Sequence, residues 1–149
     1  MSLQISTGLR DYMLVTGALK TGIDGGVIRI YDGTVPATAD AALSGNNLLC
    51  VISNNMAGTG INMATTPASG VLAKASAEVW KGLIAITGTA SFYRFSGLAD
   101  AGGLSTTEKR LQGTVAAAGG DLNFSSVAFV ANGSNTKSVD TYNVVLPTS

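Results

Sequence analysis

Short strand-forming segments separated by turn residues are the feature that most limits the folds open to this chain. Segments rich in Val, Ile, Leu, Phe and Tyr recur along the whole sequence, and Gly, Asn, Ser, Asp or Pro interrupts them at short intervals. Such a succession is typical of β-sandwiches and jelly rolls, in which many short strands share one core. The sequence therefore predicts a mainly β chain that folds as a single β-sandwich or jelly-roll-like domain over residues 1–149.

Individual strands are predicted where β-branched or alternating residues are bounded by glycine or turn dipeptides. The clearest is residues 27–32, where Arg29 and Tyr31 are expected on one face of the sheet and Ile28 and Ile30 on the other. Further strands are predicted at residues 48–53, 61–63, 71–73, 111–115, 122–124, 127–130 and 139–146, with a turn at Asn132 and Gly133 and an end to the domain at Pro147.

Residues 81–96 are the most strand-like stretch. Residues 83–86 form a continuous apolar run, which suits a strand that is covered on both faces or buried against another subunit. Two interpretations of Gly88 stay open. It can begin a two-residue hairpin turn, which would place Ala85 opposite Phe92, or it can form a bulge between two strands that do not pair directly.

One helical pattern precedes the strands. Residues 5–20 place apolar side chains at roughly helical spacing, Ser6 or Thr7 can cap the start, and Gly17 and Gly22 weaken and then end the helix. This short N-terminal helix is expected to pack on its own sheet of residues 26–147, and docking on a partner is the alternative.

The chain has an unusually low content of charged residues. Charged residues make up 12% of the sequence, against about a quarter in ordinary soluble domains. Because soluble monomers normally use charge to stay apart, we expect much of the surface to be covered by other subunits. The alternative is an extracellular-type β-domain rich in Ser and Thr.

The composition also excludes several kinds of chemistry. The nine basic and nine acidic residues are scattered and form no basic patch, so no nucleic-acid partner is expected. Histidine is absent, and Cys50 lies in a predicted buried strand without a base to activate it. No carboxylate pair or calcium loop occurs in the sequence. We therefore predict no catalytic, cofactor-binding or metal-binding residue and no cofactor, and we expect that the protein is not an enzyme.

The sequence also predicts where the protein is made. The N-terminus lacks a basic segment followed by an apolar stretch, so no secretory signal is expected. The longest apolar runs are far shorter than the roughly 20 residues of a membrane-spanning helix. Synthesis in the cytoplasm and no membrane partner are the resulting expectations.

Aromatic residues gather around residues 81–96. Trp80, Phe92, Tyr93 and Phe95 are expected to pack in the core, and the alternative is a surface on which a carbohydrate stacks. The second possibility would make the chain a carbohydrate-binding or receptor-binding tip module.

Three blocks of sequence resemble small structural proteins encoded among the virion genes of tailed bacteriophages. They are residues 26–43, residues 88–95, and the tail segments 111–115, 120–124 and 143–147. The resemblance implies a virion component, a β-sandwich that decorates or cements the capsid lattice and transfers no catalytic residues.

The resemblance also implies partners. They are the major capsid protein and copies of the chain itself, as a trimer, at the capsid surface after synthesis in the bacterial host cytoplasm. A tail, baseplate or neck subunit is the alternative, because nothing in the sequence separates head from tail.

Overall fold

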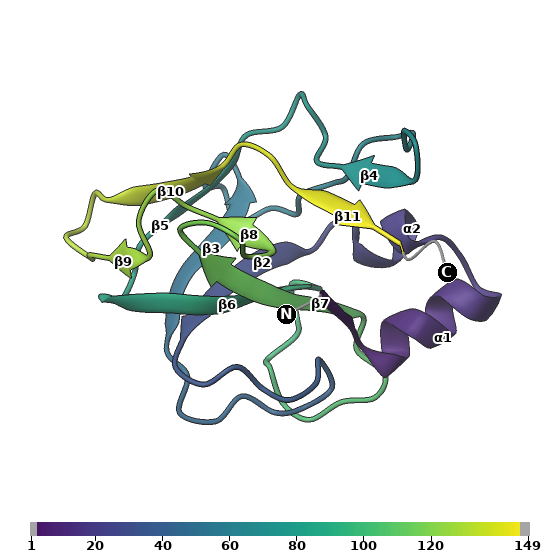
Figure 1. The fold of residues 1–149 in the computed structure, drawn as a ribbon, viewed down its shortest axis with the longest axis horizontal. Helices are drawn as coiled ribbons and strands as arrows, with labels where there is room; N and C mark the ends of the chain where they lie inside the picture. Colours follow the sequence, from purple (N-terminus) through teal and green to yellow (C-terminus); the bar gives the residue numbers. More distant parts are fainter. Residues whose placement is uncertain (1–2, 147–149) are drawn as a thin grey trace.

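The computed structural model describes residues 3–146, which fold mainly into β-strands (Figure 1). Within this range the chain forms a nine-stranded sheet, a two-stranded sheet and two short helices near its start. The predictions of a mainly β chain and of helical structure at its start are therefore confirmed. Pro147, predicted to end the domain, lies outside the described residues.

The strands of the large sheet are mostly short. They are β1 (Gln4–Ile5), β2 (Val27–Asp32), β3 (Leu48–Asn54), β5 (Trp80–Leu83), β6 (Gly88–Ser96), β7 (Arg110–Ala116), β8 (Leu122–Asn123), β9 (Ala128–Phe129) and β10 (Thr136–Val139). Their order is β1-β7-β6-β2-β3-β5-β10, with β8 also beside β7 and β9 also beside β6. The small sheet pairs β4 (Val71–Ala73) with β11 (Asn143–Val145), and every strand pair is antiparallel except β7 with β8.

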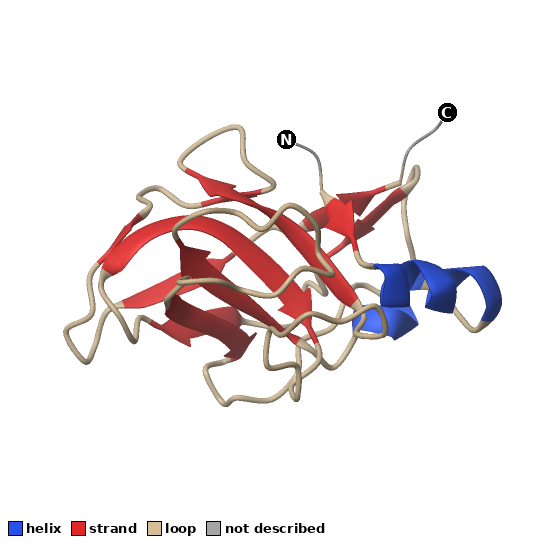
Figure 2. Ribbon diagram, turned by 90° about the horizontal axis from the view of Figure 1, so that it is seen from below, coloured by secondary structure: helices blue, strands red, loops and turns tan. Residues whose placement is uncertain are grey.

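The large sheet curls until its two ends meet. Between β8 and β10 lie five strands, so a flat sheet would hold them roughly 29 Å apart at the usual strand spacing. Yet the amine of Lys137 in β10 donates to the carbonyl of Ser126, just after β8, at 3.1 Å. The same amine lies 5.8 Å from the ring centroid of Phe124. The sheet therefore wraps around a single core, and its curvature is visible in Figure 2.

Aromatic side chains fill the middle of this core. The rings of Trp80 and Phe95 meet edge to face at 5.9 Å, and the hydroxyls of Tyr93 and Tyr142 lie 2.9 Å apart. Trp80 is 1% exposed and Tyr93 is 0% exposed. The prediction that these aromatics pack in the core is confirmed, and the alternative of a carbohydrate-stacking surface is wrong because no ligand can reach the rings.

Strand β2 confirms the predicted alternation. Ile28 and Ile30 point into the core, whereas Tyr31 stacks on Phe92 of β6 with ring centroids 5.2 Å apart. Residues on both faces of this strand are buried, because Ile28 and Ile30 lie in the hydrophobic core and Tyr31 on the other face packs against Phe92.

The structure of residues 81–96 matches neither interpretation of Gly88 in full. β5 ends at Leu83 and β6 begins at Gly88, but β2 and β3 separate these strands in the sheet, so the hairpin is wrong. The absence of direct pairing is confirmed, although Gly88 pairs with Phe129 and forms no bulge. The apolar run 83–86 is also not covered on both faces, since Leu83 and Ile86 are 45% and 44% exposed.

The predicted single helix of residues 5–20 is wrong in its extent. It is divided into α1 (Thr7–Val15) and α2 (Leu19–Ile23), and Ile5 belongs to β1. The side chain of Ser6 caps α1 by accepting from the amide of Leu9. The chain leaves the helical path at Gly17, and this turn lets α2 fold back beside α1.

Two predicted strands also differ from the structure. Residues 139–146 are divided into the end of β10, which pairs with β5, and all of β11, which pairs with β4, and the linking residue Tyr142 is buried in the core. Residues 61–63 form only isolated bridges, from Ile61 to Gly26 and from Met63 to Lys74.

Candidate functional site

A buried polar cluster lies on β6 and β7. Arg110 of β7 is 1% exposed and makes a bidentate pair with the carboxylate of Asp100, with its Nε and Nη2 atoms 2.6 and 2.7 Å from the two oxygens. Its Nη1 atom donates to the carbonyl of Ala39 at 3.0 Å. One guanidinium therefore ties the loop after β6 to the loop after β2.

Arg94 of β6 holds the same loop from a neighbouring strand. Its Nε atom donates to the Oε1 atom of Gln112 at 2.8 Å, and its Nη2 atom donates to the carbonyl of Ala41 at 2.7 Å. Its Nη1 atom is buried and has no hydrogen-bond partner among residues 3–146. Burial and the nearby charge of Arg110 lower the pKa of Arg94 to about 10, so the guanidinium remains charged at neutral pH.

The acidic members of the cluster stay ionised. Burial alone would raise the pKa of the Asp100 carboxyl, but the hydrogen bonds and charge of Arg110 and the amide of Gly102 hold it below its ordinary value. Asp40 accepts from the hydroxyl and amide of Thr7 at the start of α1. The hydroxyl of Thr7 is the main reason that the pKa of Asp40 is lowered.

Acid is therefore expected to weaken the fold. Unfolded aspartates titrate near pH 3.9, and both carboxyls titrate lower in the folded chain. Their contribution is fully present above about pH 4 to 5 and is lost as the pH falls through the folded-state pKa. The free energy of unfolding, measured by denaturant titration from neutral to strongly acidic pH, should fall most steeply below about pH 4. The decline should be shallower in Asp40→Asn, and an equal slope in both proteins would contradict the assignment.

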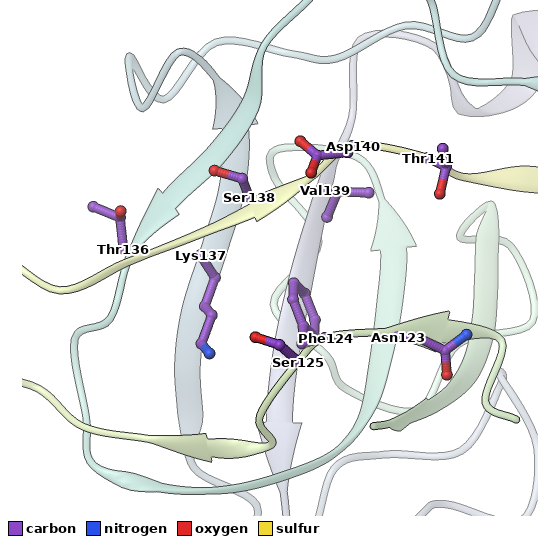
Figure 3. A pocket seen from close by; sticks show the side chains of 9 residues that line it. All are labelled: Asn123, Phe124, Ser125, Thr136, Lys137, Ser138, Val139, Asp140 and Thr141. Atoms are coloured by element: carbon purple, nitrogen blue, oxygen red, sulfur yellow. The ribbon is translucent and has the colours of Figure 1, made fainter. Parts of the chain in front are cut away.

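A slot opens where the two ends of the curled sheet approach each other (Figure 3). It lies between β10 and the segment 123–125 and has a volume of about 400 Å³. Phe124 and Val139 are buried at its floor, 7% and 3% exposed. Ser125, Ser138 and other exposed polar residues form its rim.

Two charged side chains line the slot. The amine of Lys137 lies 4.8 Å from the ring centroid of Phe129 and bonds to the carbonyl of Ser126, so it links the two ends of the sheet. Asp140 is exposed and makes no ion pair within residues 3–146. The slot thus presents hydroxyls, backbone groups and one unpaired carboxylate, an arrangement suited to noncovalent binding.

A second surface feature is apolar and lies at the end of the molecule where the helices are. Leu14 and Val15 at the end of α1 are 80% and 90% exposed, and Val145 and Leu146 near β11 are 60% and 45% exposed. A groove of about 380 Å³ between α2, β4 and β11 has Leu146 in its wall, whereas Val145 lines a separate hollow with Leu3 and Tyr93. Both views place α1, α2 and β11 at this same end (Figures 1 and 2). We call these four residues the apolar end.

The sequence predicted no catalytic, cofactor or metal residue, and the described residues include no group of three His, Cys, Asp or Glu side chains able to hold a metal ion. Cys50 is 0% exposed, and burial raises its pKa to about 12, so the thiol stays protonated at neutral pH. The buried polar cluster and the slot were both missed. The buried polar cluster could have been predicted from Arg94, because a charged residue within an apolar strand indicates a buried polar contact.

Comparison of the chain with protein-family models, curated proteins and solved structures found no match. Within residues 3–146, no helix is long and apolar enough to cross a membrane.

Proposed function

We propose that this chain is a structural, non-enzymatic protein of a tailed-phage virion that decorates or cements the capsid lattice. Its partners in this proposal are the major capsid protein and copies of itself, assembled as a trimer on the capsid surface after synthesis in the host cytoplasm. The observation that supports the proposal most directly is the apolar end. Its four exposed Leu and Val residues belong to elements at one end of the molecule, in a chain with only 12% charged residues.

The size of the apolar end suits a subunit contact. Burial of one such side chain removes roughly 60–120 Å² of apolar surface from water, so the four together offer on the order of 300 Å² per copy. Because interfaces are about 60% apolar, this implies roughly 500 Å² per copy and about 1,000 Å² in total for each contact. That area is near the lower bound for a specific interface.

The same proposal includes the fold class, a jelly-roll-like β-sandwich. What supports it is that one sheet curls around a single core and brings β10 close to the segment after β8.

Substitution of the apolar end is expected to abolish self-association. The variant Leu14→Ser/Val15→Ser removes the two most exposed apolar side chains, and light scattering after size exclusion should change from a trimer to a monomer. Leu98→Ser/Leu104→Ser is the matched control, since these residues are 53% and 77% exposed in another loop. A monomeric wild-type chain, or equal assembly of both variants, would contradict the proposal.

The position of the chain in intact virions distinguishes a capsid protein from a tail protein. Electron microscopy of virions labelled with an antibody to this chain should place the label on the capsid surface. Label on the tail, baseplate or neck would favour the alternative assignment, and unlabelled particles would refute both. A carbohydrate-binding or receptor-binding tip has no support from Trp80 and Tyr93, because both rings are buried.

A further inference from the structure

Strand β10 presents a free backbone edge to the slot. Its other edge pairs with β5, and the amide of Ile84 donates to the carbonyl of Asn135 directly opposite. Hydrogen-bonded residues alternate along an antiparallel strand, so Lys137 and Val139 also bond toward β5. The amides and carbonyls of Thr136 and Ser138 therefore point into the slot.

The opposite side of the slot is a second free edge. β8 runs parallel to β7, and the amide of Phe124 donates to the carbonyl of Ala116 in β7. By the same alternation, the backbone groups of Asn123 point away from β7 and toward the slot, before the chain bends at Ser125. Within residues 3–146 no strand pairing joins β8 to β10. The slot thus lies between the unpaired backbone groups of Thr136 and Ser138 on one side and those of Asn123 on the other.

We propose that the slot accepts an extended peptide segment of another polypeptide, which adds a strand between β8 and β10. Open sheet edges bind extended peptides through main-chain hydrogen bonds, and the pockets between them select side chains. This inference goes beyond the proposed function, because the isolated chain tests it without any virion.

The slot also defines the chemistry of this peptide. Phe124 and Val139 form the floor, and the side chain of Lys137 crosses it to the carbonyl of Ser126, so the peptide side chains that face the floor are small and apolar. The side chains between them face solvent and are polar. Asp140 lies among the lining residues without an ion pair in the described chain, which favours a Lys or Arg in the peptide beside it. The four residues of β10 fit a bound strand of about four to six residues.

The decisive variant is Ser138→Pro. It removes the amide that faces the slot but no hydrogen bond to β5, and proline is tolerated on an edge strand when its nitrogen faces outward. Ser138→Ala is the matched control, because it removes the hydroxyl and keeps the amide. Both variants should unfold at temperatures close to that of the wild type, which shows that any loss of binding is local.

Selection from a displayed library of random peptides, each about six residues long, provides the test. Peptides enriched on the full-length wild-type chain should alternate apolar and polar residues, carry a Lys or Arg, and bind Ser138→Ala equally well. They should bind Ser138→Pro about tenfold more weakly, the effect of one lost hydrogen bond. In hydrogen exchange, the amides of Thr136 and Ser138 should exchange rapidly in the free chain and become protected when peptide binds.

Three results would overturn the proposal. The first is that no peptide in the library is enriched on the wild type over Ser138→Pro. The second is that the selected peptides bind this variant as tightly as the wild type. Protection of amides outside β10 and residues 123–125 would show that the peptide binds elsewhere. None of these results depends on whether the chain is found in virions.

Discussion

The Asp100→Ala variant is expected to lower the free energy of unfolding by about 3–5 kcal/mol. Both side chains of the Asp100–Arg110 pair are almost fully buried, 3% and 1% exposed. Removal of the carboxylate leaves the guanidinium of Arg110 buried with its carbonyl partners but without a counter-charge. The guanidinium of Arg94 lies close to that of Arg110, and the repulsion between the two positive charges adds to the cost. Denaturant titration at neutral pH measures the loss.

Two further variants separate this effect from a general response to substitution. Asp140→Ala removes an exposed carboxylate and should change the free energy of unfolding by less than about 0.5 kcal/mol. Asp100→Leu/Arg110→Met replaces the whole pair with apolar side chains and should recover much of the lost stability, as such replacements of buried ion pairs often do. A loss below about 1 kcal/mol in Asp100→Ala would show that the pair contributes little to the fold.

Replacement of Trp80 with alanine is the second large effect, with an expected loss of about 3–5 kcal/mol. Trp80 is 1% exposed and contacts Phe95 and Tyr142, which come from distant parts of the chain. Its ring therefore joins β5 to β6 across the curled sheet. The truncation leaves a cavity that these aromatic neighbours fill only in part, and thermal or denaturant unfolding measures the cost.

The conservative variant Trp80→Phe identifies the source of this loss. It retains most of the ring volume but loses the indole hydrogen bond to the carboxylate of Glu78, which is 2.9 Å long. We expect Trp80→Phe to lower the free energy of unfolding by only about 1–2 kcal/mol. This result would show that most of the loss in Trp80→Ala comes from packing. If Trp80→Phe proved as destabilising as Trp80→Ala, the hydrogen bond rather than the cavity would dominate.

Together these variants test which interactions hold the surface loops in place. In the loop after β2, the carbonyls of Ala39 and Ala41 accept from Arg110 and Arg94. Asp40 connects the same loop to the start of α1. A change in the buried polar cluster should therefore alter the surface around this loop, whereas a change at Trp80 should weaken the whole core.

The sequence by itself determined the elements whose signals are local. Alternation in residues 27–32 predicted β2 and its faces, the apolar segment of residues 48–53 predicted β3 with a buried Cys50, and Ser6 was one of two predicted caps of α1. These features depend on side-chain alternation and on capping within a few residues, so neighbouring residues suffice to predict them.

Only the tertiary structure decided what depends on distant residues. The separation of β5 from β6 by two other strands, the burial of Arg94 beside Gln112, and the meeting of β8 with β10 all join segments far apart in the sequence. The apolar run of residues 83–86 predicted a covered strand, but β5 ends at Leu83, and both Leu83 and Ile86 are exposed. Strand order and sheet curvature determine which residues are covered, and both arise from long-range packing that no local pattern records.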